Sequence, residues 1–317
     1  MKNRNRNDVG SLWRLIAVLG VAAILTWPGA PLHAADAVQK QFDSPEHAVD
    51  ALVTAVRSGR TADLIAIFGP RGKPLVESGD AVADKKGRSR FVAAYDESHS
   101  LATQPDGELS LILGKDKWPF PIPLVKKGNA WRFDTAAGAE EILDRRIGRN
   151  ELSAIEVCRA YVDAQREYSS KDRNNDGLRE YAQHFASHPD QHDGLYWSTK
   201  PGEEPSPMGA LVARARDEGY ESAGTRTKRE PYHGYYYRIL KRQGTHAPGG
   251  AHDYIVGKHM IGGFALVAFP AQYGASGVMT FIVNQDGVVY QKNLGPDTEK
   301  IARQMREYDP DPSWKAN

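Results

Sequence analysis

The last third of the chain is strand-like, and this pattern restricts the fold more than any other feature of the sequence. Three runs there are apolar or alternate in polarity: residues 235–240, 264–269 and 278–283. The third run leads through a loop ending in Asp286-Gly287 into an apolar segment at 288–290, which predicts an antiparallel β-hairpin. Before these runs, apolar residues recur at helical spacing from Glu151 to Tyr168. We therefore expect one helix followed by an antiparallel β-meander over residues 150–317.

The first half of the chain shows helix signals first and strand signals afterwards. Ser44 suits a helix N-cap, Pro45 the first helical position, and Gly59 the position after the last turn. Further helices are expected at residues 61–68, 88–97 and 139–147, and strands at 108–113, 118–125 and 130–133. Prolines interrupt residues 118–125, which favours an edge position because proline donates no ladder hydrogen bond. The order predicts an α+β domain over residues 35–149, similar to the cystatin-like or nuclear-transport-factor-like roll.

The N-terminus has the order of a secretory signal. Basic side chains among residues 2–14 precede an apolar run from Leu15 to Trp27, and small residues follow. The alternative is a retained anchor, but this run is shorter than the ~20 residues that span a bilayer. We predict a signal peptide at residues 1–34, cleaved after Ala34, and a periplasmic or extracellular mature protein without stable membrane insertion.

Charge and cysteine content narrow the function classes further. Cleavage after Ala34 would change the formal net charge from +1 to about −2, which argues against a nucleic-acid partner because phosphate binding needs a basic surface. Cys158 is the single cysteine, so no intrachain disulfide forms and stability must come from packing. We expect Cys158 to be a small buried residue and not a nucleophile.

Several segments resemble an uncharacterised family of exported bacterial proteins. They are Ser153–Ile155, Ala164–Tyr168, Asp193–Trp197, Pro231–Arg238 and Gly277–Asn284. The resemblance is to domain-of-unknown-function family 2950, covers about residues 42–315, and implies a periplasmic or envelope location without an activity. The second half also resembles the globular head of pilins and pseudopilins. Because its helix is internal and amphipathic, this second resemblance implies topology alone.

One acidic segment has the spacing of a cation-binding loop. Residues 172–177 place oxygen-bearing side chains at alternate positions before a glycine, as in the first half of a calcium loop. The predicted ligands are Asp172, Asn174, Asp176, the carbonyl of Leu178 and the carboxylate of Glu180. Gln183 stands where a complete loop has a bidentate glutamate, and an Asx/Gly turn ending the helix is the alternative. Calcium is the cofactor that the sequence suggests.

Histidines mark two further places where chemistry is conceivable. Three recur every four residues and would suit zinc on a helix: His184, His188 and His192. Pro189 interrupts such a helix, which favours a solvated polar segment. His252 beside Asp253 would suit an acid–base pair, although no nucleophile stands at a recognisable turn.

An aromatic cluster is the remaining candidate surface. It comprises Tyr235, Tyr236, Tyr237 and Arg238. Alternation in a strand would place Tyr236 and Arg238 on one side and the other two on the opposite side, so one side is core. Aromatic residues are enriched at protein interfaces, which favours a binding surface at Tyr236 and its neighbours.

Few residues of the sequence form a recognisable catalytic motif. This favours a non-catalytic envelope protein that acts as a binding or scaffolding module for another envelope component. The competing hypotheses are an envelope hydrolase that uses His252 and Asp253, and a calcium-dependent structural protein. An enzymatic role is therefore less expected than a binding role.

Overall fold

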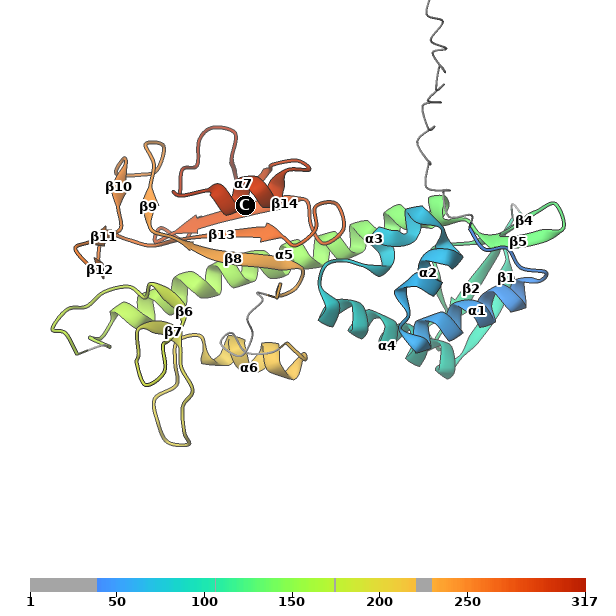
Figure 1. The fold of residues 1–317 in the computed structure, drawn as a ribbon, viewed down its shortest axis with the longest axis horizontal. Helices are drawn as coiled ribbons and strands as arrows, with labels where there is room; N and C mark the ends of the chain where they lie inside the picture. The colour runs from blue at the N-terminus through green and yellow to red at the C-terminus, as the bar shows by residue number, and fades with distance from the viewer. Residues whose placement is uncertain (1–38, 106, 174, 221–229) are drawn as a thin grey trace, which may run out of the picture. The chain divides into compact units, whose positions relative to one another are not determined.

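The computed structural model describes residues 39–105, 107–173, 175–220 and 230–317 (Figure 1). The predicted signal peptide lies outside these described residues. Helices and antiparallel sheets are both present, which confirms the α+β class. No helix among the described residues combines the length and the apolar character needed to cross a membrane.

The first part of the described chain is helical. Its elements are α1 (Pro45–Ser58), α2 (Thr61–Phe68), the 3₁₀ turn η1 (Pro70–Gly72), α3 (Lys73–Val76) and α4 (Ala81–Glu97). Ser44 caps α1 by accepting a hydrogen bond from the backbone N–H of His47 (3.1 Å). Gly59 ends α1 in the left-handed conformation at φ +67°. The helix predicted after Ser44 is confirmed as α1, and those predicted at residues 61–68 and 88–97 are confirmed as α2 and the second half of α4.

An antiparallel sheet follows these helices. Its strands are β1 (His99–Thr103), β2 (Leu109–Leu113), β3 (Trp118–Pro119), β4 (Leu124–Lys127) and β5 (Ala130–Phe133). The order is β1-β2-β4-β5, with β3 paired to β2. The edge prediction for residues 118–125 is wrong for β4, which lies between β2 and β5. Pro121 and Pro123 fall in the link before β4, where no ladder bond is required.

A single long helix, α5 (Thr135–Ser169), takes the place of the two helices that the sequence predicts. Its early residues Ala139, Ile142 and Leu143 pack against the core of the first half. Its later residues, such as Tyr161 and Tyr168, are buried in the core of the second half. The predicted domain boundary at residues 149/150 thus lies inside a continuous helix that contributes to both cores.

The second half is built on another antiparallel sheet. Its order is β16-β15-β14-β13-β8, and the strands are β8 (Tyr235–Leu240), β13 (Ala265–Pro270), β14 (Met279–Asn284), β15 (Tyr290–Asn293) and β16 (Lys315–Ala316). The predicted hairpin is confirmed as β14–β15, with Ile282 opposite Tyr290. Helix α5 packs on β13 and β14, and α7 (Thr298–Gln304) packs on β13. All six residues of β13 are buried, so both faces of this strand are covered.

The described part of the chain between α5 and β8 has little regular structure. It contains the short strands β6 (His184–Ala186) and β7 (Gly194–Tyr196), which pair in parallel, and the helix α6 (Gly209–Asp217). Two small hairpins precede β13: β9 (Arg242–Gln243) with β10 (His252–Asp253), and β11 (Ile255–Val256) with β12 (His259–Met260). The candidate metal ligands lie within residues 170–208, which we name the irregular region, and on the second hairpin.

Candidate metal centre

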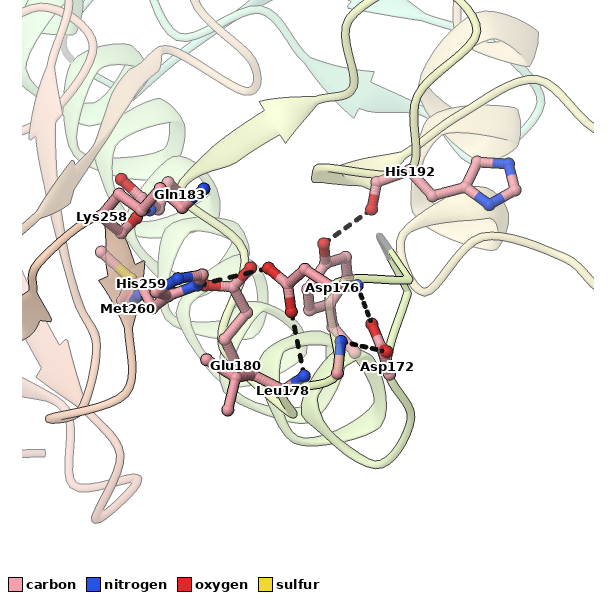
Figure 2. Close-up of polar contacts among 11 residues, drawn as sticks. Asp172, Asp176, Leu178, Glu180, Gln183, His192, Lys258, His259 and Met260 are labelled. Atoms are coloured by element: carbon pink, nitrogen blue, oxygen red, sulfur yellow. Dashed lines mark hydrogen bonds and ion pairs between the residues drawn. The ribbon is translucent and has the colours of Figure 1, made fainter.

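The turn that follows α5 is built around the side chain of Asp172. Its two carboxylate oxygens accept hydrogen bonds from the backbone N–H groups of Asp176 (3.3 Å) and Gly177 (2.9 Å) (Figure 2). Asp176 Oδ1 in turn accepts one from the backbone N–H of Leu178 (2.9 Å). Gly177 has φ +90°, which glycine adopts without strain. Short acidic side chains and a glycine thus form a tight turn here, and both the calcium-loop and the Asx-turn interpretations require such a turn.

Two carboxylates from this region converge on one histidine of the β11–β12 hairpin. Nδ1 of His259 lies 3.3 Å from Oδ2 of Asp176 and 3.2 Å from Oε2 of Glu180 (Figure 2). The ligand atoms of the three residues all lie within 4.8 Å of one another. The exposed fractions of the side chains are 26% for Asp176, 11% for Glu180 and 20% for His259. We name these three residues the acidic centre.

The two segments that form the acidic centre are clamped to each other. Gln183 donates its side-chain amide to the carbonyl of Lys258 (2.7 Å) (Figure 2). The backbone N–H of Tyr181 donates to the carbonyl of Met260 (2.8 Å), and the N–H of Met260 donates to Oε2 of Glu180 (3.2 Å). The relative position of the ligands is therefore set by backbone contacts as well as by their own charges.

A buried glutamine fixes the same segment from the side of α5. Gln165 is fully buried; its side chain donates to the carbonyl of Ala182 (2.8 Å) and accepts from the N–H of Ala182 (2.8 Å). It also donates to the hydroxyl of Tyr161 (3.0 Å). Ala182 is itself buried, so these bonds satisfy backbone groups that water does not reach.

The donor set determines which ions the acidic centre can hold. The two carboxylates suit a hard cation such as calcium, which takes oxygen ligands. The imidazole nitrogen departs from an all-oxygen set and favours zinc or a similar ion.

The predicted calcium ligands separate into different roles. Asp176 and Glu180 join the acidic centre, whereas the oxygens of Asp172 hold backbone amides of the turn. The backbone N–H of Leu178, not the carbonyl that the sequence suggests as a ligand, contacts Asp176, and Asn174 lies outside the described residues. Sequence spacing missed His259, which stands 79 residues after Glu180 in a glycine-rich stretch with no ligand pattern of its own.

A second group of ligand atoms lies further along the irregular region. The ligand atoms of His184, His188 and Asp193 lie within 4.8 Å of one another; we name these residues the histidine centre. Partial removal of its ring from water lowers the pKa of His184. Burial raises the pKa of Asp193, but hydrogen bonds from the side chain and backbone of His188 outweigh it and leave this pKa below its usual value. His192, which the spacing grouped with the other two histidines, instead stacks on Trp197 (4.4 Å between ring centroids).

The residues proposed for hydrolysis do not form an acid–base pair. His252 faces two backbone carbonyls, those of Gly250 (3.2 Å) and Gly262 (3.1 Å). Asp253 pairs instead with Arg242 (3.4 Å). Cys158 is fully buried, as the sequence predicts, and burial raises the pKa of its thiol to about 12. A group that stays protonated and inaccessible is not an activated nucleophile.

The aromatic cluster on β8 is packed on both sides. Tyr235 is fully buried and donates to the carbonyl of Met279 (2.9 Å), so it is a core residue. On the other side, Arg238 donates to carbonyls at the end of α7 and Arg303 lies over the ring of Tyr236 (5.4 Å). The alternation expected for the strand is thus present. Tyr236, Tyr237 and Arg238 are half-buried, and a binding surface at Tyr236 and its neighbours stays a prediction.

Comparison with known proteins assigns the chain to a family but gives it no activity. No curated protein matches it, and no solved structure matches it. One family of sequences, described as "Protein of unknown function (DUF2950)", matches residues 39–316. Since this match spans nearly all of the described structure, the chain belongs to the DUF2950 family.

Proposed function

We propose that this protein is a non-catalytic binding or scaffolding module of the cell envelope whose irregular region is ordered by a divalent cation. The observation that carries the proposal is the acidic centre. Three ligand groups from two segments far apart in sequence converge there, with small exposed fractions and with backbone contacts that hold both segments. Positioned ligands lower the ordering cost of ion binding.

The cation would act on structure and not on a bound substrate. The described residues of 170–208 contain many turns and few regular elements, and long irregular segments in compact domains are commonly functional. An ion shared between Asp176 and Glu180 of this segment and the hairpin at His259 would cross-link the two. It would also neutralise carboxylates that are partly removed from water. The ordered segment would then present a defined surface to an envelope partner.

Export and the finer fold belong to the same proposal. A signal peptide at residues 1–34, cleaved after Ala34, would place the mature chain in the periplasm or outside the cell. The helices and sheet before residue 149 suit a cystatin-like roll, and the later part of α5 with its antiparallel sheet suits a pilin-head-like domain. Mass spectrometry of the protein from a periplasmic fraction tests the first point. A chain that begins at Ala35 is expected, and a chain that retains residues 1–34 would contradict export by cleavage.

Calorimetric titration of the purified, chelator-stripped protein tests cation binding. Calcium is expected to give saturable heat, and Asp176→Asn and Glu180→Gln are each expected to weaken binding at least tenfold. Asp163→Asn is the matched control, because this carboxylate lies on α5 with a side chain 79% exposed. Its affinity should equal that of the unaltered protein. Absence of binding for both calcium and zinc would overturn the proposal.

His259→Gln distinguishes the two classes of ion. Calcium prefers oxygen ligands, so its affinity should change by less than about threefold. Zinc bound at the acidic centre would use the imidazole directly and should be lost. If zinc binds there and calcium does not, the cation proposal stands and the calcium prediction is wrong.

A partner that depends on the ordered segment should depend on the ion. A tagged chain crosslinked in envelope extracts is expected to recover a specific protein with the cation present. The same protein should be absent after chelation and with Asp176→Asn. If the same partner is recovered equally well after chelation and with Asp176→Asn, partner binding does not depend on the acidic centre.

A further inference from the structure

The histidine centre is distinct in chemistry from the acidic centre. It offers two imidazoles and one carboxylate, whereas the acidic centre offers two carboxylates and one imidazole. The rings of His184 and His188 stand 5.0 Å apart between centroids and nearly perpendicular, at 79°. Nδ1 of His188 lies 2.5 Å from Oδ2 of Asp193. We propose that His184, His188 and Asp193 form a binding site for Zn²⁺.

The spacing of the ligand atoms suits this ion. Zinc binds nitrogen and oxygen at ~2.0–2.2 Å in a tetrahedron, so neighbouring ligand atoms of a loaded site lie roughly 3.3 Å apart. Ligand atoms that already lie within 4.8 Å need small side-chain rotations to reach that arrangement. The exposed imidazoles of His184 and His188 leave a coordination position on the solvent side. Three protein ligands and one open position are a recurrent zinc arrangement.

The backbone around these ligands is held firmly. The pairing of β6 with β7 places His184 opposite Gly194, the residue that follows Asp193. The N–H of His188 donates to Oδ1 of Asp193 (2.9 Å), and the N–H of Gly194 donates to Oγ of Ser187 (3.0 Å). The loop from His188 to Asp193 is therefore closed at its base by side-chain and backbone bonds.

Glycine at position 194 is required for this close approach. A Cβ atom built there would lie 2.6 Å from the carbonyl carbon of Ala186 and 2.6 Å from the backbone nitrogen of Ser187. Any larger residue would push β7 away from β6 and separate His184 from Asp193. The strand pairing and the ligand arrangement thus depend on one another.

A simple ion pair does not explain why the imidazole of His184 lies beside that of His188. An Asp193–His188 pair is complete with one carboxylate and one imidazole. Within the described residues, the ring nitrogens of His184 form no hydrogen bond, and the ring instead stands edge-on to that of His188. Two adjacent imidazoles can both bind one zinc ion as neutral ligands.

Zinc titration in a background that lacks the acidic centre tests the proposal. The chain carrying Asp176→Asn and Glu180→Gln is stripped with chelator and titrated with Zn²⁺ in a calorimeter. One equivalent is expected to bind, and His184→Gln and His188→Gln should each weaken binding at least tenfold. Co²⁺ in place of zinc should give the visible absorption of a tetrahedral site, lost in the same variants. Thermal unfolding of each metal-stripped chain checks that all variants fold.

His192→Gln is the matched control. This histidine lies four residues after His188, but its ring packs on Trp197 instead of joining the centre. Zinc affinity should therefore stay within about twofold of the background chain. Equal loss in all three histidine variants, or no zinc binding in the background chain, would overturn the proposal. Calcium binding at the acidic centre should persist in His184→Gln, so failure of one site is distinguishable from failure of the other.

Discussion

The sheet around β13 and the irregular region from residue 170 to residue 208 are held in place by different forces. β13 is buried along its whole length between α5 and α7, so apolar contact and ladder hydrogen bonds stabilise it. The irregular region is tied down by polar contacts at a few points, such as Gln165 with Ala182 and Gln183 with Lys258. Stability of the sheet should be insensitive to ions, whereas order in the irregular region should respond to them.

Truncation in the sheet is expected to have the largest effect. Phe281→Ala removes a fully buried ring of β14 that packs near Tyr235 (5.8 Å between centroids). The cavity and the lost apolar burial should cost about 3–5 kcal/mol of unfolding free energy. Urea denaturation measures this loss, which should be the same with and without added cation. A loss below about 1 kcal/mol would show that the sheet is not the stable part of the second half.

Loss of the buried glutamine is expected to have the next largest effect. Gln165→Leu leaves the N–H and the carbonyl of Ala182 without their partner, at about 1–3 kcal/mol for each buried group. Gln183→Leu is the matched control, because the hydrogen bond from Gln183 to Lys258 is exposed and should be worth about 1 kcal/mol or less. Equal losses in the two variants would contradict the distinction between a buried and an exposed attachment point.

Changes in the turn after α5 should be smaller. Asp172→Ala removes the acceptor for two backbone N–H groups that can reach water instead, so we expect a loss of about 1 kcal/mol. Asp172→Asn keeps one acceptor oxygen and should lose less. Thermal unfolding compares them. If Asp172→Ala abolishes calcium binding while Asp172→Asn keeps it, Asp172 supports binding by holding the turn in place and not by ligating the ion.

An exposed polar pair beside the sheet should have the smallest effect on stability. Hydrogen bonding and charge from Asp309 raise the pKa of His246. A histidine whose pKa is raised by folding contributes stability below its unfolded pKa, and this contribution disappears as the pH rises through the folded value. An NMR titration should give His246 a pKa above ordinary histidine values, and Asp309→Asn should return it toward them. No change between the two chains would contradict the pairing.

Local signals account for much of the fold. Ser44, Pro45 and Gly59 each perform the role that their residue types favour, and the Asp-Gly loop before β15 forms the expected hairpin. The two helices predicted on either side of residue 149 are one helix, because Gly148 and Asn150 continue it and each of its halves is buried in a core. Tertiary packing there outweighs local propensity.

The candidate site was predictable only in its local part. The spacing of Asp172, Asp176 and Glu180 indicates a cation loop, because neighbouring residues of one turn share a local geometry. His259 reaches the same place through a hairpin and a clamp of long-range hydrogen bonds, which no spacing rule describes. Helical spacing does not describe the histidine centre either, because strand and turn, not helix, bring His184, His188 and Asp193 together.

Amide hydrogen exchange of the stripped protein, with and without saturating cation, tests the central claim most directly. Exchange in the irregular region, especially at residues 176–183 and in the hairpin at 259–260, should slow at least tenfold when the ion binds. Exchange in β13 and β14 should not change. Cation binding that leaves the irregular region as fast as before, or that slows the sheet equally, would contradict the account.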